Sequence, residues 1–119
     1  MDPACTSIMN EPHEVLLVLT NLPDRDSALR LAQGLVDRRV AACVNVLGGC
    51  TSVYRWNGQT EQADEVPLLV KTTGAGYAAL EAAIREAHPY ELPEIIAVPV
   101  THGLPAYLAW VATETAPAT

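Results

Sequence analysis

Apolar side chains recur along the chain with the two spacings that mark buried strands and helices. A continuous apolar run over residues 14–20 predicts a central strand, because a strand covered on both faces carries apolar residues at nearly every position. Helical spacing follows over residues 24–39. Asp24 is suited to cap the first turn of this helix, and Arg38 with Arg39 to close its last turn.

The middle of the chain predicts a β-hairpin. Two β-prone segments lie within residues 42–56, and Asn57-Gly58 follows them directly. This dipeptide favours a tight hairpin turn because both residues tolerate positive φ. The returning strand ends in an apolar stretch over residues 66–71, in which Pro67 lacks an amide donor and is expected at a strand start or a bulge.

The rest of the chain predicts a helix, a strand and a final helix. The helix covers residues 74–88 and is ended by Pro89, since the residue before proline avoids the α region. A strand over residues 94–100 comes next, and a short helix opens after Pro105. The order β-α-β-β-α-β plus a C-terminal helix is the split βαβ, ferredoxin-like arrangement of the α+β class.

Length and composition fit one compact domain. With 119 residues, half of them hydrophobic, the chain can bury a core without disulfides or metals. We expect a flexible tail over residues 1–12, which show no periodicity, and a single domain over residues 13–115. The net charge of −7 opposes contact with phosphate backbones and anionic membranes, so neither nucleic acid nor membrane is an expected partner. Without a recognisable signal peptide or spanning segment, the expected location is cytoplasmic.

One face of the predicted sheet has no cover. Both long helices would lie on the other face, so the apolar side chains of this one require a second copy of the chain. The hairpin around Gly58 is a natural arm for reaching a neighbouring subunit. Tyr54 and Trp56 are two residues apart and share one face of that arm, where we expect an interface. The sequence therefore predicts an oligomer of this chain.

Several segments occur in the order and spacing of one known family. They are Ala41-Ala-Cys-Val-Asn45, Ser52-Val-Tyr-Arg-Trp-Asn-Gly58, Glu61 followed by Glu65, Leu69-Val-Lys-Thr72, His88-Pro-Tyr-Glu-Leu-Pro-Glu94, Val98-Pro-Val-Thr-His-Gly103 and Tyr107-Leu-Ala-Trp110. Over residues 15–112 the chain thereby resembles the CutA family, the divalent-cation tolerance proteins. The resemblance implies a homotrimer of ferredoxin-like subunits, without defined catalytic activity, linked to tolerance of copper and other divalent metals.

The candidate metal ligands are His88 and Cys43. Some members of the family carry Cys at the end of the first strand and a His pair after the second helix, where this chain has Thr20 and Ala87-His88. Copper needs several imidazole or thiolate ligands, so we expect weak binding of a divalent metal and no tightly bound cofactor. The alternative for His88 is a structural role at a helix end. Cys43 lies in an apolar run and is expected to be a buried, protonated thiol without basic neighbours.

A second group of residues is a candidate pocket between subunits. Lys71 is expected to pair with Glu61 or Glu94, either as a salt bridge between subunits or as the floor of a small anion site. The alternative function is therefore a trimeric small-molecule sensor. No catalytic triad or phosphate-binding loop is recognisable, so we predict no enzyme; an enzyme using His88, Tyr90 and Glu94 is the third interpretation. The candidate pocket residues are Tyr54, Trp56, Glu61, Lys71, Tyr90 and Glu94.

Overall fold

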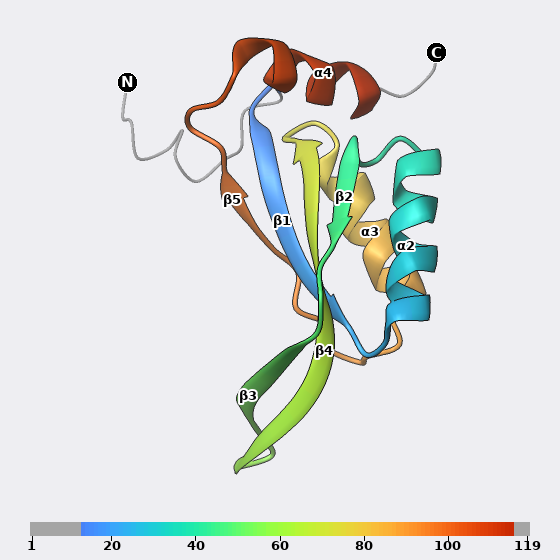
Figure 1. Ribbon diagram of the computed structural model, residues 1–119, viewed down its shortest axis with the longest axis vertical. Helices are drawn as coiled ribbons and strands as arrows, with labels where there is room; N and C mark the ends of the chain where they lie inside the picture. Colours follow the sequence, from blue (N-terminus) through green and yellow to red (C-terminus); the bar gives the residue numbers. More distant parts are fainter. Residues whose placement is uncertain (1–12, 116–119) are drawn as a thin grey trace.

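The computed structural model describes residues 13–115, which form an antiparallel sheet, helices against it and a projecting hairpin arm (Figure 1). The tail predicted over residues 1–12 lies outside the described residues, so it and the domain boundary stay predictions. The elements are β1 (Val15–Leu22), α2 (Arg25–Asp37), β2 (Cys43–Val46), β3 (Cys50–Trp56), β4 (Gln59–Thr73), α3 (Tyr77–Ala87), β5 (Ile96–Pro99) and α4 (Pro105–Thr115). With β2 and β3 as one interrupted strand, this order confirms the predicted ferredoxin-like α+β fold.

The sheet has the strand order β2-β4-β1-β5, and β3 pairs with β4 off this path. All pairings are antiparallel. β4 has 15 residues, enough to pair with β2 and β1 inside the sheet and then with β3 in the arm. Asn57 (φ 51°) and Gly58 (φ 78°) turn the arm at its tip, which confirms the predicted hairpin with positive φ at both residues.

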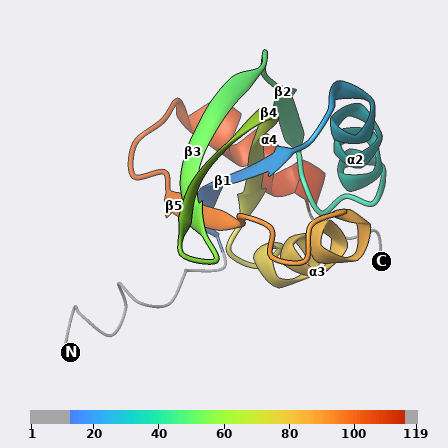
Figure 2. The same cartoon turned by 90° about the horizontal axis from the view of Figure 1, so that it is seen from below.

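The core lies between one face of the sheet and helices α2 and α3, which Figure 2 shows on the same side of the strands. Alternate residues of β1, among them Leu16, Val18 and Leu22, are buried on this face. Asp24 caps α2 as predicted, since its carboxylate accepts a hydrogen bond of 2.8 Å from the amide of Ser27.

Three predicted boundaries need correction, and one predicted position is confirmed. α2 ends at Asp37, so Arg38 and Arg39 lie beyond its last turn; Arg39 has φ 60° and points its guanidinium to α4 instead. α3 begins at Tyr77, later than predicted, because residues 74–76 form a turn. β5 is limited to Ile96–Pro99, the stretch that pairs with β1. Pro67 lies inside β4 at a bulge, the second of its two predicted positions, because the three residues 47–49 stand opposite only Val66 and Pro67.

The position of Pro67 has a simple physical reason. Its carbonyl accepts a hydrogen bond of 3.0 Å from the amide of Leu47. The amide and carbonyl of one residue in an antiparallel ladder face the same neighbour, so the missing donor faces residues 47–49, where β2 has ended and β3 has not begun. The proline therefore interrupts the ladder opposite an existing break in the partner strand.

The other face of the sheet is covered only at one end. There α4 packs Val111 onto Val15 and Ala42, and Figure 1 shows the helix across that end of the strands. Beyond α4, two cross-strand rows remain, which we call the open face: Cys43, Lys71, Leu17 and Val98 in one row, and Asn45, Leu69, Leu19 and Ile96 in the other. No helix in the described part of the chain is long and apolar enough to cross a membrane.

Candidate functional site

The imidazole of His88 is held between two backbone groups. Nε2 donates a hydrogen bond of 2.6 Å to the carbonyl of Asn21, and Nδ1 accepts one of 3.1 Å from the amide of Tyr90. Because Nδ1 is an acceptor here, the hydrogen-bonding pattern assigns the proton to Nε2. The ring is only 8% exposed. This geometry fits the structural alternative for His88, since binding a metal would cost the ring one of its two hydrogen bonds.

Tyr90 extends this arrangement toward the arm. Its ring lies 4.7 Å from that of His88, measured between centroids. Burial and a hydrogen bond to Glu65 raise the pKa of Tyr90 to about 12, with smaller contributions from Tyr54 and Asp24. The turn after α3 is thus hydrogen-bonded to the end of β1 through His88 and to β4 through Tyr90, at the place where the arm leaves the sheet.

Two polar residues beside His88 complete what we call the junction cluster: Asn21, Glu65, His88, Tyr90 and Glu94. The Asn21 side-chain amide donates a hydrogen bond of 3.1 Å to Oε1 of Glu94. The backbone carbonyl of Asn21 accepts the hydrogen bond from Nε2 of His88. Local sequence patterns indicate His88, Tyr90 and Glu94 as site residues, but they do not indicate Asn21 or Glu65. Only their strand positions reveal them, because Asn21 pairs with Pro67 two residues from Glu65 in β4.

The six predicted pocket residues are spread over three places in one subunit. Tyr90 and Glu94 belong to the junction cluster. Tyr54 and Glu61 are directly paired in the arm, and Trp56 lies beside its turn, 42% exposed. Lys71 lies in the open face. Within a single subunit the structure forms no common pocket from them.

Lys71 has partners other than those predicted. Its ammonium group donates a hydrogen bond to Oδ1 of Asn45 and lies 3.9 Å from Sγ of Cys43. Glu61 is ten residues away along the extended β4, about 33 Å, so this pair does not form within one subunit, and the pairing between subunits stays a prediction. Glu94 instead accepts its hydrogen bond from Asn21.

Cys43 is also less isolated than its apolar run indicates. The thiol is half-buried, pairs across the strands with Lys71, and lies close enough to Tyr107 of α4 to raise the pKa of that phenol, after burial as the main cause. The predicted buried thiol without basic neighbours is therefore wrong. The sequence run hides this because the cross-strand neighbour is 28 residues away. We call Cys43, Asn45, Lys71 and Tyr107 the polar patch of the open face.

The two predicted metal ligands lie in different parts of the molecule. His88 binds the carbonyl of Asn21, whereas Cys43 shares a row with Leu17, four residues or about 13 Å back along β1. Within residues 13–115 no three His, Cys, Asp or Glu side chains are grouped as a metal site requires. Thr20 is buried in the core, and its hydroxyl has no hydrogen-bond partner among the described residues.

Comparison with known proteins gives one consistent result. Residues 16–114 match the family model described as CutA1 divalent ion tolerance protein. The divalent-cation tolerance protein CutA of Thermus thermophilus is 41% identical over 99 residues, 83% of this chain and 96% of that protein. A Xenopus laevis CutA homolog is 45% identical over 89 residues, which cover 75% of this chain and 59% of the homolog.

Solved structures agree with the sequence matches. The structure of the divalent cation tolerance protein from Thermus thermophilus superposes with a TM-score of 0.84 at 40% identity, covering 86% of this chain and 99% of that one. An Archaeoglobus fulgidus CutA, described as a periplasmic divalent cation tolerance protein, has a TM-score of 0.83 at 29% identity, covering 86% and 99%. None of these names is that of an enzyme. The fold, the match over 16–114 and these identities together show that the chain belongs to the CutA1 divalent ion tolerance family.

Proposed function

We propose that the chain acts in the cytoplasm as a non-enzymatic homotrimer in the tolerance of divalent metals, copper among them, and binds such metals only weakly. The observation that carries the proposal is the open face. It presents Val98 (45% exposed) and Ile96 (52% exposed) beside the half-buried leucines of β1 and β4. Apolar surface gathered on one sheet face favours burial against further copies of the chain.

The arm adds a second apolar surface to the same proposal. Tyr54 and Trp56, on one face of the arm, are 41% and 42% exposed, and Val53, on the opposite face, is 62% exposed. A hairpin of two strands is marginally stable on its own in water, so an arm that projects from the sheet gains from contact with a neighbour. In a closed ring of three, the open face and the arm of each subunit meet a different, complementary surface of a neighbouring subunit, so no such surface is left free for further association.

Light scattering coupled to size exclusion tests the assembly. At micromolar concentration we expect a mass of about 38 kDa, three times the 12.7 kDa of one chain. Aromatic and aliphatic contacts dominate such an interface, so the mass should persist in about 0.5 M NaCl. A single species of monomer mass would contradict the proposal, and so would a stable dimer.

The metal part of the proposal rests on the chemistry of the ligands present. His88 keeps an imidazole, but Thr20 and Ala87 offer a hydroxyl and a methyl group, which do not replace thiolate and imidazole for copper. Cys43 and Cys50 are free thiols among the described residues, which fits a reducing compartment. The family name supplies the link to divalent metals; copper and weak affinity are our extension.

The polar patch favours a second candidate function, a trimeric sensor with a ligand cleft between subunits. Lys71 is half-buried in an otherwise apolar row, where its ammonium group is available to an anionic metabolite brought against the open face. A thermal-shift screen against divalent metals and anionic metabolites separates the two functions. Stabilisation by metabolites that disappears in Lys71→Gln would favour the sensor over metal tolerance.

A further inference from the structure

A cavity of about 320 Å³ lies away from the open face and the junction cluster. It is formed where the end of α2, the start of α3 and the end of α4 meet, three ends that Figure 1 shows at the same end of the molecule. Its described lining contains two arginines and a histidine and no Asp or Glu. The polar lining residues are His13, Arg38, Arg39, Thr73 and Thr115.

This concentration of positive charge is unusual for the chain. The net charge is −7, and only seven Lys and Arg residues are present, of which Arg38 and Arg39 both line this cavity. A basic concave surface on an acidic protein attracts anions locally even though the whole molecule repels them.

Arg39 lines the cavity beside the end of α4. Its Nη2 donates a hydrogen bond of 2.8 Å to the carbonyl of Thr113, which holds the guanidinium against the end of α4. Its Nε is buried, and it finds no acceptor among the residues that the structure describes. The backbone of Arg39 has φ 60°, a conformation that Asn or Gly adopts more easily, so Arg is held there at a conformational cost.

The start of α3 supplies further donors. Gly76 precedes the helix and offers no side-chain cap, and the amide of Gly76 is bound by Thr73. The first-turn amides that follow carry the positive end of the helix dipole. Ala79, in this first turn, lines the cavity.

From these features we propose that the cavity binds a small oxyanion of the phosphate type. Such an anion accepts hydrogen bonds only, and it would meet the guanidinium groups of Arg38 and Arg39, which both line the cavity, and the first turn of α3. The volume lies at the low end of the range for ligand pockets, roughly 300–1,000 Å³, which suits an inorganic anion or a single phosphate group. This site lies within one subunit and is independent of both metal binding and assembly.

Inorganic phosphate is the probe for the test, titrated into the full chain at constant pH and ionic strength with NaCl as the balancing salt. Two-dimensional NMR should show the amides of Ala78 and Ala79 shifting with phosphate in a saturable way. Isothermal titration should give binding that is weakened at least tenfold in Arg38→Gln and in Arg39→Gln. Ala79→Leu, which fills the cavity without changing charge, should weaken it equally.

Arg85→Gln is the matched control, because it removes the same charge at the far end of α3. We expect its phosphate affinity to stay within twofold of the parent. Equal shifts with NaCl alone, or equal weakening in Arg85→Gln, would overturn the proposal. If Arg39→Gln does not fold, Arg38→Gln and Ala79→Leu still decide, because both positions are exposed on the surface.

Discussion

His88 joins two parts of the chain that lie 67 residues apart, through its bond to the carbonyl of Asn21. Replacing it by Ala removes this donor and leaves the carbonyl without its partner at a site that is 8% exposed in the parent. We expect His88→Ala to lower the free energy of unfolding by about 2–3 kcal/mol in urea denaturation. His102→Ala, at an exposed position, should change it by less than about 0.5 kcal/mol. Similar losses in both variants would show that the His88 bonds contribute little.

The same residue limits metal affinity. Isothermal titration of tag-free protein with Cu(II), Zn(II) and Ni(II) should give dissociation constants of micromolar or weaker, about −8 kcal/mol or less favourable. The reason is that His88, at the end of α3, already uses both ring nitrogens, and that its predicted partner Cys43 lies on β2 in the open face. Nanomolar binding that His88→Gln abolished would contradict this geometry.

Tyrosine ionisation gives a further measurement at this scale. The pKa values of Tyr90 and Tyr77 are both raised to about 12, in each case first by burial and then by a neighbouring glutamate. A raised pKa favours the neutral phenol in the folded state, so its stabilising effect is complete below about pH 10 and is lost as the pH rises through about 12. Absorbance at about 295 nm should show a step near pH 12 whose amplitude falls in Tyr90→Phe. A Tyr90→Phe titration identical to the parent at that pH would refute the assignment.

The hairpin arm is the element whose contribution is easiest to isolate. Trp56→Ala removes an exposed aromatic side chain that we expect to be buried between subunits, so assembly should weaken by about 2 kcal/mol or more. Gly58→Val acts on the same arm by placing a β-branched residue at φ 78°. Sedimentation or light scattering at decreasing concentration would measure both. An unchanged dissociation profile in the two variants would mean that the subunits do not associate through the arm.

At the level of elements, the sequence predicts well whatever depends on local patterns. The Asp24 cap, the Asn57-Gly58 turn and the strand and helix order all follow from side-chain chemistry within a few residues. Strand register does not follow from such local patterns. The contact of Lys71 with Cys43 depends on the pairing of two strands whose contacting residues are 28 positions apart. The apolar run around Cys43 does not indicate that contact. The junction cluster was half recognised for the same reason, since Glu65 and Asn21 become neighbours only through β1 and β4.

For the whole molecule, the open face and the arm make assembly separable from folding. Val98→Lys places a second charge in the row that contains Lys71, on the exposed edge strand β5, so we expect a monomer that keeps the helical circular dichroism spectrum of the parent. Leu29→Lys on α2 is the matched control, because Leu29 is 46% exposed against 45% for Val98 but lies on the helical side. The control should remain a trimer. If Leu29→Lys dissociates the assembly and Val98→Lys does not, the interface lies on the helices.

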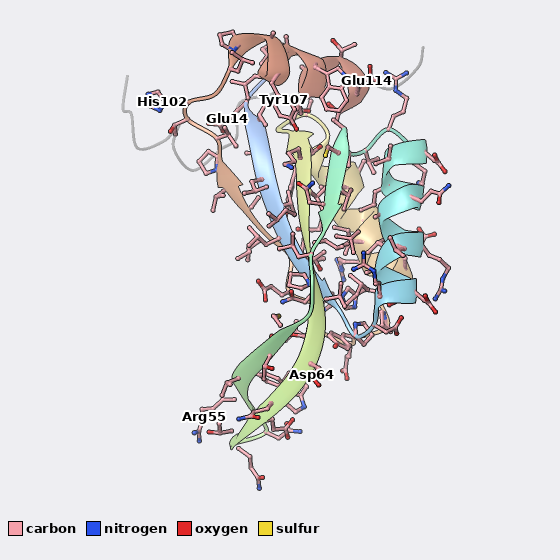
Figure 3. All side chains as sticks on the ribbon, viewed as in Figure 1. Glu14, Arg55, Asp64, His102, Tyr107 and Glu114 are labelled. Carbon is pink, nitrogen blue, oxygen red and sulfur yellow. The ribbon has the colours of Figure 1, made fainter. Side chains whose placement is uncertain are left out.

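Figure 3 shows the side chains of the arm, Arg55 and Asp64 among them. One strand of the arm is part of β4, which runs without a break from the sheet into the arm. This continuity has a consequence for how the arm can change in length. Deleting one residue from β4 would send every side chain beyond the deletion to the opposite face, because the side-chain period of a strand is two. Deleting two residues from each arm strand keeps the faces. The length of the arm can therefore change only by an even number of residues in each strand. Chimeric or shortened arms designed on that rule should retain the aromatic face that carries Tyr54 and Trp56.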